Sequence, residues 1–257
     1  MNTNTVLLII IPFFLLLISV ETIYSYRKQK KLYNFKDSLV SILLGVLAVL
    51  NRTLTKGLWL ALWMYLYQFS FFKIPPSIWG WVLLILCNEL VYYWFHRWSH
   101  KNKYLWAIHV NHHSSEYFNF STGARQPFFS LILHNIFWIP LLFLGFDPLM
   151  IFVVENIGGL FGFLTHTQLI KNIPYLDKII VAPVHHSIHH ASNKEYLDKN
   201  FGNLLIIFDR LFGTFQKEEP EIEIKFGLTK NINTYNPIKV IFHKWIDIFR
   251  GNKANPD

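Results

Sequence analysis

The sequence predicts an all-α integral membrane protein, with an N-terminal anchor helix, two transmembrane helical hairpins and a cytoplasmic histidine-rich helical cap. Three observations predict this class. Hydrophobic residues make up 52% of the 257 positions. Charged residues make up only 16%, where a soluble domain has about 25%. The 12 histidines cluster beside apolar segments. Intrinsic disorder and a disulfide scaffold are excluded, because apolar residues are abundant and Cys87 is the single cysteine.

The first apolar segment, residues 6–20, predicts a retained anchor helix. A basic cluster at residues 27–31 follows it, whereas a signal peptide carries its positive charge before the apolar core. We therefore expect the N-terminus outside and the basic cluster in the cytoplasm. The predicted organisation is an anchor with its basic segment at 1–35, a main membrane domain at 36–245 and a polar tail at 246–257.

Four longer apolar stretches predict the two hairpins. Residues 57–72 and 77–95 form the first, with Pro75 and Pro76 breaking the chain between them. Residues 127–146 and 148–164 form the second, joined by a tight turn.

Segment 38–50 is short for a span, and whether it crosses the membrane stays open at this stage. If it only lies in the interface, residues 96–126 and 165–257 both face the cytoplasm. That topology places nearly all histidines and most Lys and Arg residues on one side, as the positive-inside bias favours.

The basic balance, a net charge of +8, indicates contact with an anionic lipid leaflet and no nucleic-acid partner. The sequence carries no organelle-retention signal, which favours a bacterial inner membrane. Nothing in it indicates an oligomeric state.

The histidines form three motifs beside the apolar segments. One is H-x-x-x-H and two are H-x-x-H-H, and their members are His96 and His100; His109, His112 and His113; and His186, His189 and His190. On a helix these spacings place each set on one face. Two H-x-x-H-H motifs with an H-x-x-x-H exceed what chance gives for this composition.

Neutral imidazole is the commonest metal-binding side chain and suits Fe, Zn, Cu and Ni. Eight clustered histidines exceed the three or four that one zinc uses and indicate two metal ions, which could activate O2 if they are iron. Two alternatives remain: a zinc-dependent membrane hydrolase, and a non-catalytic metal-binding transporter or sensor. No H-E-x-x-H motif or nucleophile elbow supports the hydrolase.

The motifs and their surroundings resemble the fatty acid hydroxylase/sterol desaturase superfamily, and within it the alkylglycerol monooxygenase branch. The resemblance covers residues 36–245. Its most specific stretches are YYWFHRWSH (92–100), HVNHHSSEYFNFSTGARQ (109–126), HHSIHH (185–190), KNFGNLLIIFDRLFGTFQ (199–216) and GLTKNINTYNPIKVIFH (227–243).

The resemblance implies a membrane-bound non-haem di-iron oxygenase with two Fe ions that uses O2 on a C–H bond of a lipid, whether fatty acyl, alkyl-ether or sterol-like. Hydroxylation, ether cleavage and desaturation stay open as outcomes. The electron donor, a tetrahydropterin, ferredoxin or cytochrome, also stays open. The implied metal ligands are His96, His100, His109, His112, His113, His166, His186, His189 and His190, with His185 as the alternative to His186. Two positions after His166, where the branch carries Glu, this chain has Gln168.

Metal-bound histidines usually donate their other N–H to a carboxylate or a carbonyl. Glu89 lies two helical turns before His96 and so shares its face. Asp209 is the other predicted carboxylate partner, with a local ion pair to Arg210 or a helix-capping role as the alternative. Glu116 and Gln126 flank HVNHH and could contact a lipid head group or a reductant. We expect His134, inside an apolar segment, to be a packed, hydrogen-bonded histidine rather than a ligand.

Overall fold

The computed structural model describes the backbone of residues 3–251 and the side chains of residues 12–129 and 134–251. Within this part of the chain only two isolated β-bridges occur, so the all-helical prediction is confirmed. The helices are α1 (Thr3–Arg27), α2 (Phe35–Tyr67), α3 (Ile78–Lys101), α4 (Lys103–His113), α5 (Phe120–Gly123), α6 (Ser130–Phe137), α7 (Ile139–Phe143), α8 (Pro148–Leu164), the 3-10 helix η1 (Leu176–Lys178), α9 (Pro183–His189), α10 (Ile207–Leu211) and α11 (Pro237–Phe249).

The long helices begin at polar side chains that cap them. Asn34 accepts hydrogen bonds from the first backbone N–H groups of α2, and Ser77 accepts one at the start of α3. Asp147 does the same for α8, where Pro148 occupies the first helical position. Such caps satisfy N–H groups that have no partner inside the helix.

The predicted segment 38–50 and residues 57–67 of the predicted segment 57–72 lie in one helix, α2, which has 33 residues; residues 68–72 follow its end. The expected break between them is wrong, because residues 51–56 contain no proline or glycine that would end a helix. At about 1.5 Å per residue, α2 is about 50 Å long and exceeds the roughly 30 Å hydrocarbon core of a bilayer. Its first turns therefore extend beyond the apolar part of the molecule.

The second predicted hairpin consists of shorter helices than the first. The stretch 127–146 is divided into α6 and α7, which meet at Trp138, and Pro140 lies in the first turn of α7. The stretch 148–164 is α8, as predicted. Among the described residues, α2 and α3 are the two helices long and apolar enough to cross a membrane, and the apolar helices of the second pair are shorter.

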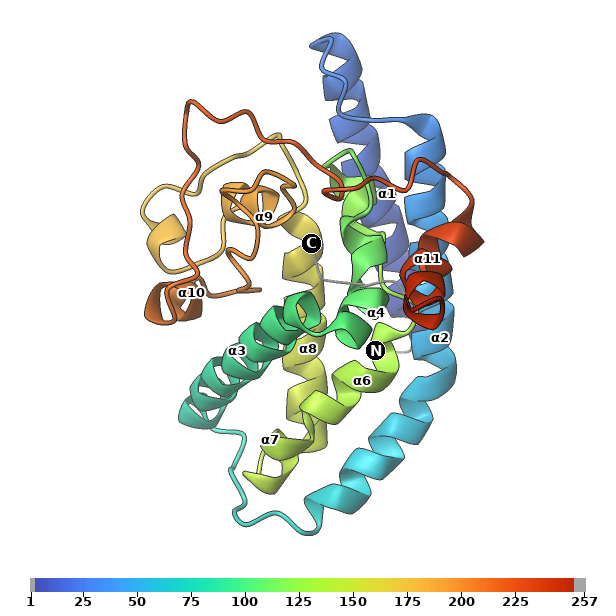
Figure 1. Cartoon of the computed structure of the whole chain (residues 1–257). Helices are drawn as coiled ribbons and strands as arrows, with labels where there is room; N and C mark the ends of the chain where they lie inside the picture. Colours follow the sequence, from blue (N-terminus) through green and yellow to red (C-terminus); the bar gives the residue numbers. More distant parts are fainter. Residues whose placement is uncertain (1–2, 252–257) are drawn as a thin grey trace.

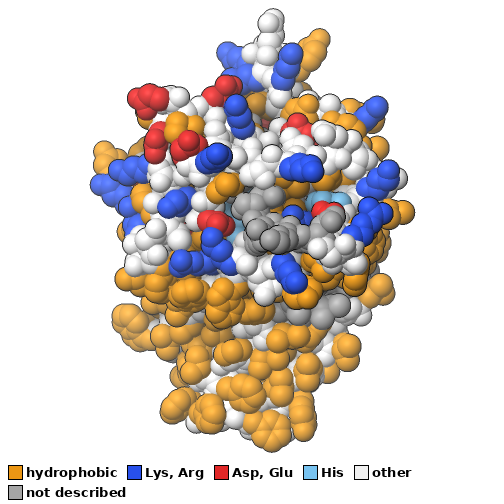
Figure 2. All heavy atoms as spheres, viewed as in Figure 1, with side chains coloured by type: hydrophobic (Ala, Val, Ile, Leu, Met, Phe, Trp, Pro, Cys, Tyr) orange, Lys and Arg blue, Asp and Glu red, His pale blue; other side chains and the backbone are white. Residues whose placement is uncertain are grey.

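The helices form an apolar half and a polar half. The α2–α3 and α7–α8 connections lie at one end, and α9 and α10 lie toward the other (Figure 1). Hydrophobic side chains cover the first end, and charged side chains gather over the second (Figure 2). The main apolar core packs α2, α3, α7 and α8 together around Trp63, Leu84, Trp138, Leu142 and Ile151. The histidines lie where this core meets the polar half.

The two ends of the chain pack on the same bundle. In α1, the ring of Phe14 stacks on that of Phe163 with centroids 4.1 Å apart. In α11, Val240 is buried against Val40 and Leu44 of α2. Helix α11 continues through Phe249 into the segment predicted as a polar tail; residues 252–257 of that segment lie outside the described residues.

Candidate metal centre

Four parts of the chain bring nine histidines together. Helix α3 supplies two, α4 three, the end of α8 leads to His166, and α9 with its last turn supplies three. They form two groups. Within each group, every imidazole has a ring nitrogen within 4.8 Å of a ring nitrogen of every other member. The first cluster is His96, His100, His109, His113 and His189, and the second cluster is His112, His166, His186 and His190.

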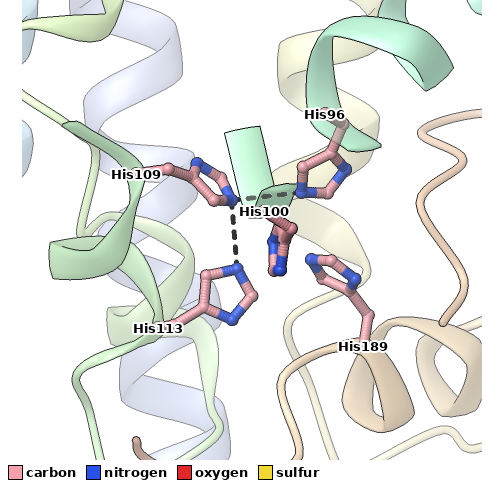
Figure 3. Close-up of side chains that lie close together, drawn as sticks. All are labelled: His96, His100, His109, His113 and His189. Atoms are coloured by element: carbon pink, nitrogen blue, oxygen red, sulfur yellow. Dashed lines mark hydrogen bonds between the residues drawn. The ribbon is translucent and has the colours of Figure 1, made fainter. Parts of the chain in front are cut away.

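The five imidazoles of the first cluster point toward a common centre (Figure 3). The Nε2 atom of His109 lies 3.1 Å from that of His96 and 3.0 Å from that of His113. The Nε2 atoms of His100 and His189 are buried and have no hydrogen-bond partner among the residues that the structure describes. Buried nitrogens are normally hydrogen-bonded, so two orphaned nitrogens facing the cluster are suited to a metal.

The imidazoles of the second cluster lie equally close to one another. The Nε2 atom of His166 lies 3.0 Å from that of His186 and 3.2 Å from that of His190. The two clusters adjoin, since the ring of His190 stacks on the ring of His113 with centroids 4.3 Å apart.

Backbone carbonyl groups fix the tautomers of four of these rings. The Nδ1–H groups donate to carbonyl oxygens 2.6–2.9 Å away, which leaves each Nε2 unprotonated and aimed at its cluster. The pairs are His96 with Phe201, His189 with Lys199, His112 with Arg125, and His166 with Gly162.

Burial keeps these imidazoles neutral. It lowers the pKa of His112 to about 4. It also lowers the pKa of His186 well below its ordinary value, and the neighbouring imidazoles add to that effect. Metal binding requires the neutral form, so the clusters hold their imidazoles ready to bind at neutral pH.

The donor set fits two metal ions. Two nitrogens at about 2.1 Å from one ion, at right angles, are about 3.0 Å apart, which matches the 3.0–3.2 Å separations in both clusters. Nine imidazoles exceed the needs of one ion. Nitrogen-only sites select transition metals such as Fe and Zn rather than Mg or Ca.

The two predicted carboxylates lie beside the first cluster and act on a loop, residues 199–205. Asp209 accepts hydrogen bonds from the N–H groups of Phe201 and Gly202, both at 2.7 Å. Glu89 accepts them from Leu204 and Leu205 at 2.7 and 2.9 Å. These carboxylates therefore fix the loop whose carbonyl groups orient the imidazoles.

The histidines outside the clusters have other partners. His185 points away from the second cluster: its Nδ1 accepts the N–H of Ala182, and its ring packs on Phe215. The geometry thus brings His186 into the cluster. His134 stacks on Trp138 and its Nε2 lies 3.1 Å from a carboxylate oxygen of Glu155.

The two flanking residues have neighbours outside the clusters. Gln126 is exposed, donates to the carbonyl group of Gly123 and lies on the wall of a cavity described below. Glu116 is exposed beside Gly227, a loop glycine with positive φ.

Sequence reasoning missed Glu21 and Arg125. Glu21, fully buried on α1, accepts the N–H of Phe120 at 2.8 Å and the hydroxyl of Thr167, next to His166. Arg125, also buried, pairs with Asp37 and carries the carbonyl group that orients His112. The only signal was one acidic residue at the end of an apolar segment and a GARQ stretch beside HVNHH.

A cavity of about 210 Å³ opens between α2, α3, α6 and α8 and ends at the histidines. Its inner end is formed by His109 of the first cluster and by His112, His166 and His186 of the second. Aromatic side chains line its walls, including Trp59, Trp63, Tyr92, Phe95 and Phe163. The second cluster is therefore the more accessible from the apolar half.

Fold and site together give an all-helical protein with two long apolar helices and two buried histidine clusters whose geometry suits a pair of metal ions. The fatty acid hydroxylase family matches residues 81–214. That stretch contains all nine clustered histidines, His166 included, and therefore all three motifs. The chain belongs to this family, which confirms the resemblance found in the motifs. No solved structure matches the chain.

Named relatives agree with this family. The chain is 37% identical to human alkylglycerol monooxygenase over 95% of its own length and 55% of that protein. It is 36% identical to the zebrafish (Danio rerio) alkylglycerol monooxygenase, over 90% of this chain and 52% of the relative. It is 30% identical to the ornithine lipid hydroxylase OlsE of Rhizobium tropici, over 59% of this chain and 46% of that protein. The chain thus spans about half the length of the curated relatives it matches.

Proposed function

We propose that this chain is a membrane-bound non-haem di-iron oxygenase that hydroxylates a C–H bond of a lipid with O2. The observation that carries the proposal is the cavity, because it joins an apolar, aromatic-lined opening to the imidazoles of both clusters. A substrate that enters between helices of the apolar half and reaches buried metal ligands is a lipid. The names of the relatives, lipid monooxygenases and a lipid hydroxylase, support the same reaction class.

The first cluster would hold one iron ion through five imidazoles, and the second cluster would hold the other through four. Iron bound there supplies the capacity to activate O2 and oxidise an unactivated C–H bond. The chain orients the imidazoles through the carbonyl groups described above. The rings of Phe118 and Phe201 pack against the second and first clusters respectively and exclude water from them.

The walls of the cavity would position the lipid chain. Gly158, Gly159 and Gly162 of α8 line the cavity together with Trp59 and Trp63 of α2, and the side chain of Asn203 lies against Gly158 and Gly162. A lining of small residues and flat rings would admit an unbranched chain and restrain its lateral movement.

The polar half would face the cytoplasm of a bacterial cell, since Lys and Arg gather on it and the positive-inside bias favours that side. Two electrons would come from a redox partner on that side: a tetrahydropterin, a ferredoxin or a cytochrome.

The test is the metal content of protein purified anaerobically from iron-replete cells. We expect about two irons per chain and fewer in His112→Ala, followed by O2-dependent oxidation of a lipid. A single zinc and no iron under these conditions would replace the proposal with a zinc-dependent membrane hydrolase. Two irons with no O2 consumption on any membrane lipid extract would instead indicate a metal-binding protein without this activity.

A further inference from the structure

Two cations line the cavity that leads to the histidines. Arg52 and Lys56 lie one helical turn apart on α2, and Trp59 and Trp63 follow on the same face at helical spacing. Arg52 is half-buried and Lys56 is exposed. Charged side chains within an apolar spanning helix are costly and mark functional positions.

Neither cation forms an ion pair among the described residues, although the charge of Arg52 acts on nearby Glu155. The guanidinium of Arg52 lies 5.9 Å from the ring centroid of Phe152 on α8. The cavity's one acidic residue in this region, Glu155, is already paired with His134 at 3.1 Å. The net charge of Arg52, Lys56, Glu155 and His134 together is therefore positive, whichever protonation state the Glu155–His134 pair adopts.

The size of the cavity limits what can enter it. A volume of about 210 Å³ is below the roughly 300–1,000 Å³ of pockets that enclose a whole drug-sized ligand. A complete lipid does not fit. The polar end of a lipid with its first few carbons does, while the rest of the chain lies along the apolar helices.

We propose that Arg52 and Lys56 form a subsite for an anionic, phosphate-type lipid head group. The inference rests on the proposed function, because it assigns the class of lipid that this site takes. Arg binds phosphate through paired N–H groups and Lys adds a second charge. A phosphate held there lies in the same cavity as the second cluster, with the chain between Trp59, Trp63 and the glycines of α8.

The experiment uses the full-length chain in nanodiscs of zwitterionic phosphatidylcholine. The probes are an alkyl phosphate and an alkylglycerol that carry the same dibrominated chain, because bromine quenches the fluorescence of nearby Trp59 and Trp63. We expect the alkyl phosphate to reach half-maximal quenching at about tenfold lower concentration than the alkylglycerol.

The variants separate the subsite from a general attraction to the membrane. Arg52→Gln should weaken binding of the alkyl phosphate about tenfold and leave the alkylglycerol unchanged. Lys56→Gln should act in the same direction with a smaller effect, because Lys56 is more exposed. Lys36→Gln, at the exposed start of the same helix, is the matched control and should change neither probe.

Three results would overturn the subsite. One is equal binding of the two probes to the wild-type chain. Another is an Arg52→Gln effect of the same size on both probes, which indicates contact with bulk lipid. The third is displacement of the alkyl phosphate by micromolar inorganic phosphate, which assigns the site to the free ion. Because the readout needs neither metal nor O2, it can fail while the oxygenase proposal stands, and it can succeed if the metal proves to be zinc.

Discussion

The first histidine cluster is oriented by a loop, residues 199–205, which Glu89 and Asp209 fix through four backbone N–H groups. The second cluster is oriented differently, by the carbonyl group of Arg125, whose guanidinium pairs with Asp37, and by contacts next to His166 that involve Glu21. Of the four clustered imidazoles that line the cavity, the second cluster supplies three, those of His112, His166 and His186. Two sites of the same chemistry thus have different supports and different access.

This difference suggests a division of labour. The second cluster lies where a lipid chain can reach it, and the first lies behind it, between α3, α4 and the loop. A substitution in the contacts that orient one cluster should therefore weaken metal binding at that cluster more than at the other. Blocking the cavity should weaken lipid binding and leave metal binding at both clusters unchanged.

Removing a ligand should have the largest effect. We expect His100→Ala and His186→Ala each to lower the iron content from about two to about one per chain and to reduce lipid oxidation by at least about a hundredfold, since both irons are needed. Metal analysis and product formation measure the two effects. His243→Ala, in α11 and outside both clusters, is the control. If either ligand variant kept two irons, its cluster would not be a metal site.

The pH dependence of the iron-free protein should be the next largest effect. Burial lowers the pKa of His112 from 6.5 to about 4, and the pKa of His190 also falls well below its ordinary value. The unfolded chain therefore binds more protons below pH 6.5, so stability is full above that pH and is lost as the pH falls toward 4. His112 alone accounts for up to about 3 kcal/mol.

Thermal unfolding of the iron-free protein in detergent between pH 8 and pH 4.5 measures this. We expect a constant Tm above pH 6.5 and a falling one below it, with the fall moved to lower pH once iron is bound. A Tm that rose as the pH fell would mean that the imidazoles are protonated in the folded state, contrary to their burial.

Filling the cavity should separate access from metal binding. A Cβ at Gly159 would meet no atom of the described part of the chain within 4 Å, and Gly159 lines the cavity. We expect Gly159→Phe to weaken lipid binding more than about tenfold and to leave both irons in place. Gly57→Phe is the matched control, because Gly57 is equally open but lies outside the cavity. Loss of iron in Gly159→Phe, or equal effects in both variants, would contradict this role of the cavity.

Much of the site was predictable because its information is local. Helical spacing places His96 with His100, and His109 with His113, on one face, and the chain's polarity marks where the helices leave the apolar half. The pairing of motifs is not local. That His189 joins the α3 histidines while His190 joins His112 depends on how α9 packs, and no spacing encodes it.

The same limit applies to the fold and to the supports. The continuity of α2 follows from local helix propensity, which the mostly polar residues 51–56 concealed by interrupting the apolar pattern. The role of Asp209 could be suspected from its motif, but its partners are backbone N–H groups. Glu21 lies 146 residues before its partner Thr167, and one buried carboxylate carries no sequence pattern that names a partner so distant.

The smallest effects should come from these two carboxylates, and they test the division of the clusters most directly. Asp209→Asn replaces an acceptor oxygen that faces a backbone N–H of Phe201 or Gly202, so the carbonyl group that orients His96 is held less firmly. We expect iron to bind the first cluster about tenfold more weakly, with the second cluster retained.

Glu21→Gln should weaken iron binding at the second cluster and leave the first unchanged. It keeps the size of the side chain but loses the charge that accepts hydrogen bonds from Phe120 and Thr167, and the effect reaches His166 through its neighbour. We expect a weakening of the second cluster alone, by a few-fold, on the order of 1 kcal/mol. Iron titration with Mössbauer spectroscopy of the half-loaded protein distinguishes the two sites. If both variants weakened the same iron, the clusters would share one support, and the division between them would be wrong.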